Sequence, residues 1–237
     1  MTTNDTQPSQ EDRTPETQEG RAFQHNRRLG RGVNVLGYDP IWLNPDEARM
    51  EAHHFQRLHE AGFDHVRINL HPFGHMGPAP EYKLPGAWFQ TLDWALENAL
   101  DHDLMVVLDM HEFNAMGDDA EGNHDRMMAT WRQLARRLVD APDTVFFEIL
   151  NEPCRTLTPE LWNLYLREAH SLIRKTHPDR ILVIGPAQWN KIAQLEALRL
   201  PESDRNIITS IHYYKPRRFT HQGAAWTDYR NVKGVVW

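Results

Sequence analysis

An asparagine, a glutamate and a proline follow an apolar run, an arrangement that could fix a catalytic carboxyl at the mouth of a strand. The run covers residues 144–150, and Asn151, Glu152 and Pro153 come directly after it. Its β-branched, aromatic and aliphatic residues predict a buried strand, which the proline prevents from continuing as a central strand. A carboxyl beside apolar groups can have its pKa raised, which suits a general acid. The alternative is an ordinary strand-to-loop turn with a solvated glutamate.

Polar and aromatic side chains recur in the other predicted strands or just after them. Each has a structural explanation by itself, because a strand arginine usually pairs with a carboxylate and a loop tryptophan usually packs. Their recurrence after strand upon strand points instead to a shared site, since parallel strands bring their carboxyl ends to one edge. The residues are Arg67, His111, Asn151, Glu152, Trp189, Asn190, His212 and Tyr214.

Strand-like and helix-like patterns alternate from residue 31 onward, which predicts a parallel sheet covered by helices. No glycine-rich phosphate loop follows a strand, and this weakens the Rossmann and flavodoxin-like alternatives. The expected fold class is therefore α/β, an incomplete (β/α)8 TIM barrel with about six of its eight strands. Strands are predicted at 32–37, 64–70, 104–110, 144–150, 180–185 and 206–212, and helices at 45–62, 88–102, 124–140, 159–177 and 189–200.

Size and charge exclude several classes of protein. The 237 residues can bury one large core, and a net charge of −7 argues against nucleic-acid binding. No apolar run is long enough to predict a membrane span. Residues 1–20 carry five acidic residues against one basic residue, so we expect a disordered acidic tail over 1–22 and a barrel domain over 23–237. Residues 1–20 also lack a secretory signal pattern, which leaves a cytoplasmic location as the default.

Metal and nucleophile motifs are weak in this sequence. Its 14 histidines include the neighbours His53 and His54, which would point in different directions on a helix. His71 and His75 flank a turn, and no His-Glu-x-x-His spacing occurs. A serine-hydrolase elbow is absent, and the single Cys154 permits no intrachain disulfide. We expect no metal and no cofactor.

Five short motifs, in the order expected for barrel strands, resemble glycoside hydrolase family 5, the cellulase-like retaining (β/α)8-barrel glycosidases. The resemblance covers roughly residues 31–226 and implies a hydrolase of β-linked polysaccharides, most closely an endo-β-1,4-glucanase. It also implies secretion, so the location stays open. The motifs are Arg31-Gly32-Val33-Asn34, Val66-Arg67-Ile68-Asn69, Leu108-Asp109-Met110-His111, Glu148-Ile149-Leu150-Asn151-Glu152-Pro153 and Ile211-His212-Tyr213-Tyr214.

The resemblance implies catalytic roles for four of these residues. Glu152 would be the general acid that protonates the leaving sugar oxygen and then the base that activates water. Asn151 would hydrogen-bond the 2-hydroxyl group of the sugar. Arg67 and Tyr214 would hold and polarise the nucleophile carboxylate.

Further residues would bind and orient the polysaccharide or oligosaccharide substrate. His111 and His212 would orient the substrate and the acid/base. Trp189 would offer an apolar face on which a pyranose ring stacks, and Asn34 and Asn190 are also predicted to bind substrate.

The sequence departs from the family at the nucleophile, a glutamate at the end of the seventh strand, because no seventh strand is predicted. Asp109 and Glu112 are the alternatives near Glu152. We therefore expect a truncated chain with impaired hydrolysis and exposed sheet edges. A non-catalytic carbohydrate-binding remnant is the alternative function, and a barrel enzyme of unrelated chemistry is a third.

Overall fold

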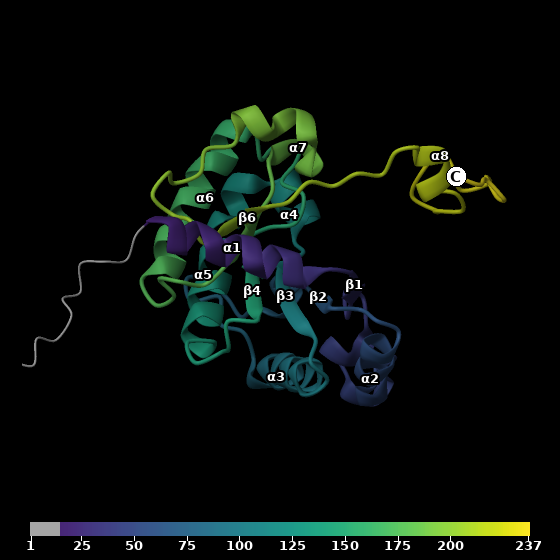
Figure 1. Ribbon diagram of the computed structural model, residues 1–237, viewed down its shortest axis with the longest axis horizontal. Coiled ribbons are helices and arrows are strands. Elements are labelled where there is room, and N and C mark those ends of the chain that lie inside the picture. Colours follow the sequence, from purple (N-terminus) through teal and green to yellow (C-terminus); the bar gives the residue numbers. More distant parts are fainter. Residues whose placement is uncertain (1–14) are drawn as a thin grey trace, which may run out of the picture.

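The computed structural model describes residues 15–237 and contains one sheet of six strands (Figure 1). The strands lie side by side in chain order, and each neighbouring pair is parallel. This topology confirms the predicted α/β fold with six of the strands of a (β/α)8 barrel. The strands are β1 (Gly32–Val35), β2 (His65–Leu70), β3 (Met105–Met110), β4 (Val145–Glu148), β5 (Leu182–Ile184) and β6 (Ile207–Thr209).

Helices connect the strands, and α2, α3, α5 and α6 surround the sheet, while α8 stands apart from it (Figure 1). In the described part of the chain, no helix has the length and apolar character needed to cross a membrane. The α-helices are α1 (Pro15–Leu29), α2 (Ala52–Glu60), α3 (Gly86–Asp101), α4 (Phe113–Asp118), α5 (Ala120–Arg137), α6 (Pro159–Arg174), α7 (Ala187–Asn190) and α8 (Arg217–Thr220). The 3-10 turns are η1 (Pro40–Trp42), η2 (Pro45–Glu47), η3 (Pro72–His75) and η4 (Ile192–Ala197).

Helix α6 illustrates how local sequence defines an element. The Thr158 side chain accepts a hydrogen bond from the Leu161 backbone N–H and caps the helix, and Pro159 occupies the first turn. Apolar residues at helical spacing then form one buried face. That face consists of Trp162, Tyr165, Leu166, Ala169 and Ile173.

The two faces of the sheet bury different clusters, because alternate strand residues point to opposite sides. Along β3, Val106 and Leu108 belong to the large core beneath the helices, whereas Met105 and Val107 belong to a smaller inner cluster. Asp109 continues this inner row at the carboxyl end of β3 and is completely buried. The inner face therefore changes from apolar at the amino end to polar at the carboxyl end.

Helix α1 closes the amino end of the inner cluster. Ala22 packs with it, and the His25 ring lies edge-on to Phe146 at 5.4 Å. The carbonyl of Leu29 lies 2.5 Å from His65 Nδ1 at the start of β2. Helix α1 begins at Pro15, within the tail predicted for 1–22, and the first 14 residues of that tail lie outside the described part.

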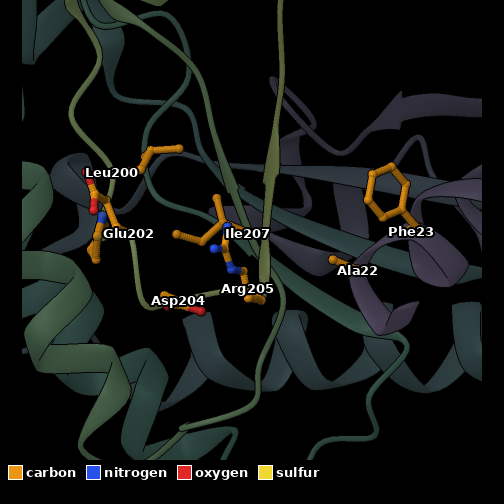
Figure 2. A pocket seen from close by; sticks show the side chains of 8 residues that line it. Ala22, Phe23, Leu200, Glu202, Asp204, Arg205 and Ile207 are labelled. Atoms are coloured by element: carbon orange, nitrogen blue, oxygen red, sulfur yellow. The ribbon is translucent and has the colours of Figure 1, made fainter. Parts of the chain in front are cut away.

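Strands β1 and β6 form the two edges of the described sheet, as predicted. A cavity of about 560 Å³ lies beside β6, and Figure 2 shows α1 side chains on one side and those of 200–207 on the other. It adjoins the first residue of β6, at the opposite end from the polar residues, so it is not the candidate active site. A second hollow of about 530 Å³ runs along β1.

Most predicted elements differ in their bounds from the structure, and three of the differences have a visible cause or change the element. The predicted helix 45–62 is split into η2 and α2, because the Asp39 carboxylate accepts the backbone N–H groups of Arg49 and Met50 and holds that stretch extended. The predicted helix 189–200 is replaced by the short α7 and η4, since Trp189 and its neighbours have left-handed backbone angles. The predicted strand 206–212 is shortened to β6.

Candidate active site

Arg67 of β2 is the centre of a polar network on the inner face. Its Nε and Nη2 atoms donate to the two carboxylate oxygens of Glu148 on β4, at 2.6 and 2.8 Å. Its Nη1 atom lies 2.9 Å from Asp109 and donates to Asn34 at 3.2 Å. A further bond of 2.9 Å joins Arg67 Nη2 to Asn151 Oδ1. One guanidinium thus connects side chains from β1, β3, β4 and the loop after β4.

Burial and charge oppose each other in this network. Burial alone would lower the pKa of Arg67, but the carboxylates of Glu148 and Asp109 outweigh it and raise that pKa. The pKa of Glu148 is raised by its own burial and by the charge of Asp109, and Arg67 acts in the opposite direction. Two buried carboxylates, those of Glu148 and Asp109, thus share one guanidinium. Neighbouring carboxylates repel each other when both are ionised, which opposes the ionisation of the second.

Glu152 lies in the loop that follows β4, directly after Asn151 of this network. Its φ angle is 43°, a left-handed conformation that is uncommon for a residue other than glycine. Its side chain is 15% exposed, and Oε1 lies 2.6 Å from Nδ1 of His212. The structure therefore holds the Glu152 carboxyl against an imidazole that follows β6, with part of its surface open to solvent.

Asn190 supports His212 through its backbone carbonyl. The His212 backbone N–H donates to the Asn190 carbonyl at 2.9 Å. The Asn190 side chain is completely buried and packs so closely on Gly185 that a Cβ added there would lie 2.3 Å from Asn190 Cγ. No surface of Asn190 is accessible in this conformation, and direct substrate binding by Asn190 stays a prediction.

Two aromatic side chains lie near Glu152. Tyr214 is half-exposed and lies edge-on to His212 at 6.2 Å. Burial raises the pKa of Tyr214, the charge of Glu152 raises it further, and Arg67 opposes both. Trp189 is 38% exposed, and its backbone N–H donates to the Pro153 carbonyl at 3.1 Å. The structure thus brings Tyr214 and Trp189 to the mouth of the sheet as predicted, while their roles stay predictions.

His111 is fixed by Asp109, whose Oδ2 lies 2.5 Å from His111 Nδ1 and accepts a 2.7 Å bond from Asn69. This arrangement leaves Nε2 as the ring nitrogen of His111 available to a ligand. It also argues against Asp109 as a substitute nucleophile, since the carboxylate is completely buried and bound to Arg67. Glu112, the other alternative, accepts the Phe73 backbone N–H at 2.6 Å.

Glu148 and Asn69 are members of this network for which the sequence predicts no role. Glu148 lies inside the apolar run of β4, where its neighbours are typical of a strand that contributes only to the core. A buried carboxylate requires a partner. The signal that could have identified one is Arg67, which lies in another predicted strand, two strands away in the sheet. Among residues 15–237, no group of three or more His, Cys, Asp or Glu side chains is arranged to hold a metal ion.

Comparison with known proteins places this geometry in a family. The model for cellulase (glycosyl hydrolase family 5) matches residues 26–236. Endoglucanase H of Acetivibrio thermocellus is 28% identical over 220 residues, which are 90% of this chain and 24% of that protein. Endoglucanase 3 of Fibrobacter succinogenes is 34% identical over 155 residues, which are 62% of this chain and 23% of that protein. The chain thus spans about a quarter of the length of these relatives.

Solved structures agree with these matches. Thermotoga maritima Cel5A in complex with mannotriose superposes with a TM-score of 0.82 and 38% identity, over 91% of this chain and 71% of that one. A hyperthermophilic endo-β-1,4-glucanase in complex with substrate gives a TM-score of 0.83 and 33% identity, over 91% of this chain and 70% of that one. With its six parallel strands and a family match over nearly all described residues, the chain belongs to the cellulase family, glycosyl hydrolase family 5.

Proposed function

We propose that this chain carries the acid/base machinery of a retaining glycoside hydrolase that acts on O-glycosidic bonds in β-linked polysaccharides, with β-1,4-glucan as the substrate class. The observation that carries the proposal is the Glu152 carboxyl, held 2.6 Å from His212 at the carboxyl end of the sheet. The names of the relatives, endoglucanase H and endoglucanase 3, support the substrate class.

In this proposal Glu152 gives its proton to the leaving glycosidic oxygen and later removes a proton from water. Its bond to His212 fixes one carboxylate oxygen, so that the other can face the substrate. Asn151 is oriented as well, because its Oδ1 accepts from Arg67 at 2.9 Å. The Asn151 Nδ2 group is then the part of the amide left to donate to the sugar 2-hydroxyl, a bond that strengthens in the transition state.

Retention also requires a second carboxyl about 5–5.5 Å from the first. Glu148 and Asp109 are bound to Arg67, and Glu112 is bound to the Phe73 backbone. We therefore assign the nucleophile to none of these three carboxylates. Unassisted hydrolysis by this chain is expected to be weak or absent.

Glucose- and mannose-based oligosaccharides are the proposed ligands. Thermotoga maritima Cel5A has been solved in complex with cellobiose as well as with mannotriose. The inner face of this chain offers amides, imidazoles and a half-exposed tyrosine at its polar end, groups that hydrogen-bond sugar hydroxyls.

Chemical rescue tests the proposal. An aryl cellobioside is incubated with the chain and sodium azide, which can act as an external nucleophile. Azide would form a bond to the anomeric carbon as the glycosidic C–O bond breaks, with Glu152 donating the proton to the leaving oxygen. We expect azide-dependent release of the aryl alcohol from a weakly acidic leaving group, and its loss in Glu152→Gln. Equal azide-dependent rates in the two proteins would contradict the acid/base assignment.

A carbohydrate-binding remnant is the second candidate function, favoured by the full engagement of Arg67 with Glu148 and Asp109. Isothermal titration with cellohexaose and mannohexaose separates the two. Binding without azide-dependent cleavage supports the carbohydrate-binding remnant. Strong turnover without azide would refute the expectation that unassisted hydrolysis by this chain is weak. Failure to bind either sugar would contradict both functions.

A further inference from the structure

The loop after β1 is held rigidly at the mouth of the sheet. Its first residue, Leu36, has a left-handed φ of 65°, and its carbonyl accepts a 2.6 Å bond from Trp42 Nε1. The Asp39 carboxylate accepts the backbone N–H groups of Ile41 and Met50, at 3.0 and 2.9 Å. These bonds fix both ends of the segment that carries Tyr38.

Tyr38 presents an aromatic ring from this loop. The ring is 73% exposed, and it stacks on His71 with a centroid distance of 4.7 Å and an interplanar angle of 30°. His71 in turn lies edge-on to His111 at 5.2 Å. The centroid of the Tyr38 ring is therefore within about 10 Å of that of His111, and His71 connects the two rings. Tyr38 thus adjoins the candidate active site.

One face of Tyr38 is covered by His71, and the residue remains largely exposed. His71 Nε2 is buried and has no hydrogen-bond partner among the described residues, so the imidazole is held here by packing against two rings. A flat aromatic surface that is already immobile loses little conformational entropy when a ligand covers it.

We propose that Tyr38 is a stacking platform for a pyranose ring of a β-linked oligosaccharide, a subsite on the other side of Glu152 from Trp189. Tyr38 follows β1, Glu152 follows β4 and Trp189 follows β5, so the strand order places the acid/base between the two aromatic residues. The inference rests on the proposed function, because it extends the same site along the sugar chain.

Isothermal titration with cellobiose, cellotetraose and cellohexaose tests the subsite. In the unmodified chain, affinity is expected to rise with oligosaccharide length as both platforms become occupied. Tyr38→Ala should lower the affinity for cellohexaose about three- to tenfold, the range that one aromatic stacking contact provides. Tyr38→Phe should retain the affinity, because stacking uses the ring and not the hydroxyl group.

Phe23→Ala is the matched control, since Phe23 is 67% exposed on α1 at the other end of the sheet. Circular dichroism should show the same fold in every variant. Unchanged affinity of Tyr38→Ala for cellohexaose, or an equal loss in Phe23→Ala, would overturn the subsite while leaving the proposed function intact. Absence of oligosaccharide binding in the unmodified chain would overturn both.

Discussion

Replacing Glu148 tests whether the Arg67 network holds the inner face together. Glu148 is 2% exposed and accepts two bonds from Arg67, at 2.6 and 2.8 Å. Hydrogen bonds to charged groups contribute about 1.5–3 kcal/mol each. Removing them is partly offset, because Arg67 keeps Asp109 and the repulsion between the two carboxylates disappears. We expect Glu148→Ala to lower the free energy of unfolding by about 3 kcal/mol, near the low end for breaking a buried pair.

Glu148→Gln separates the loss of charge from the loss of the side chain. The amide oxygen can keep one bond to Arg67, while its NH₂ group cannot accept the other. The expected cost is about 1 kcal/mol, smaller than that of Glu148→Ala. Urea unfolding followed by tryptophan fluorescence measures both values, provided that the m-value does not change.

Glu97→Ala serves as the control, because Glu97 is an exposed carboxylate on α3. Its expected effect is within about 0.5 kcal/mol. The reasoning would be refuted if Glu148→Ala cost no more than Glu97→Ala, or if Glu148→Gln were the more damaging of the two Glu148 variants.

Two further predictions concern buried groups. Burial and, to a lesser degree, the charge of His111 lower the pKa of His71 from 6.5 to about 4. The stability that neutral His71 contributes to the fold is therefore present above pH 6.5 and is lost as the pH falls toward 4. In His71→Phe, the unfolding free energy measured between pH 4 and 7 should depend less on pH, and an unchanged profile would contradict the assignment. Burial also raises the pKa of the Cys154 thiol, whose Sγ lies 3.7 Å from the Phe113 carbonyl. Cys154 should react with a disulfide reagent only after denaturant is added, so rapid labelling of the native chain would show that it is accessible.

Individual strands and the position of the acid/base candidate could be predicted from local sequence. Apolar runs at 104–110 and 144–150 identify β3 and β4, because a strand buried on both faces needs apolar residues throughout. Pro153 then places Glu152 beyond the strand. These features depend on residues close together in the chain, so the pattern of apolar residues and the position of a proline are enough to predict them.

The partners of each side chain were decided by tertiary structure. The Arg67–Glu148 pair joins residues 81 positions apart, and the Glu152–His212 pair joins residues 60 positions apart. No local pattern encodes such pairs, since they depend on the register between neighbouring strands and on which face each residue occupies.

Asn190 shows the same limit. Its position after a predicted strand suggested a ligand-binding amide, yet left-handed backbone angles at Gln188, Trp189 and Asn190 turn Trp189 outward and bury the asparagine. The sequence by itself determined which residue types reach the carboxyl end of the sheet. Only the three-dimensional packing decided which of them face substrate and which support their neighbours, because burial and hydrogen bonding are shared between segments distant in the chain.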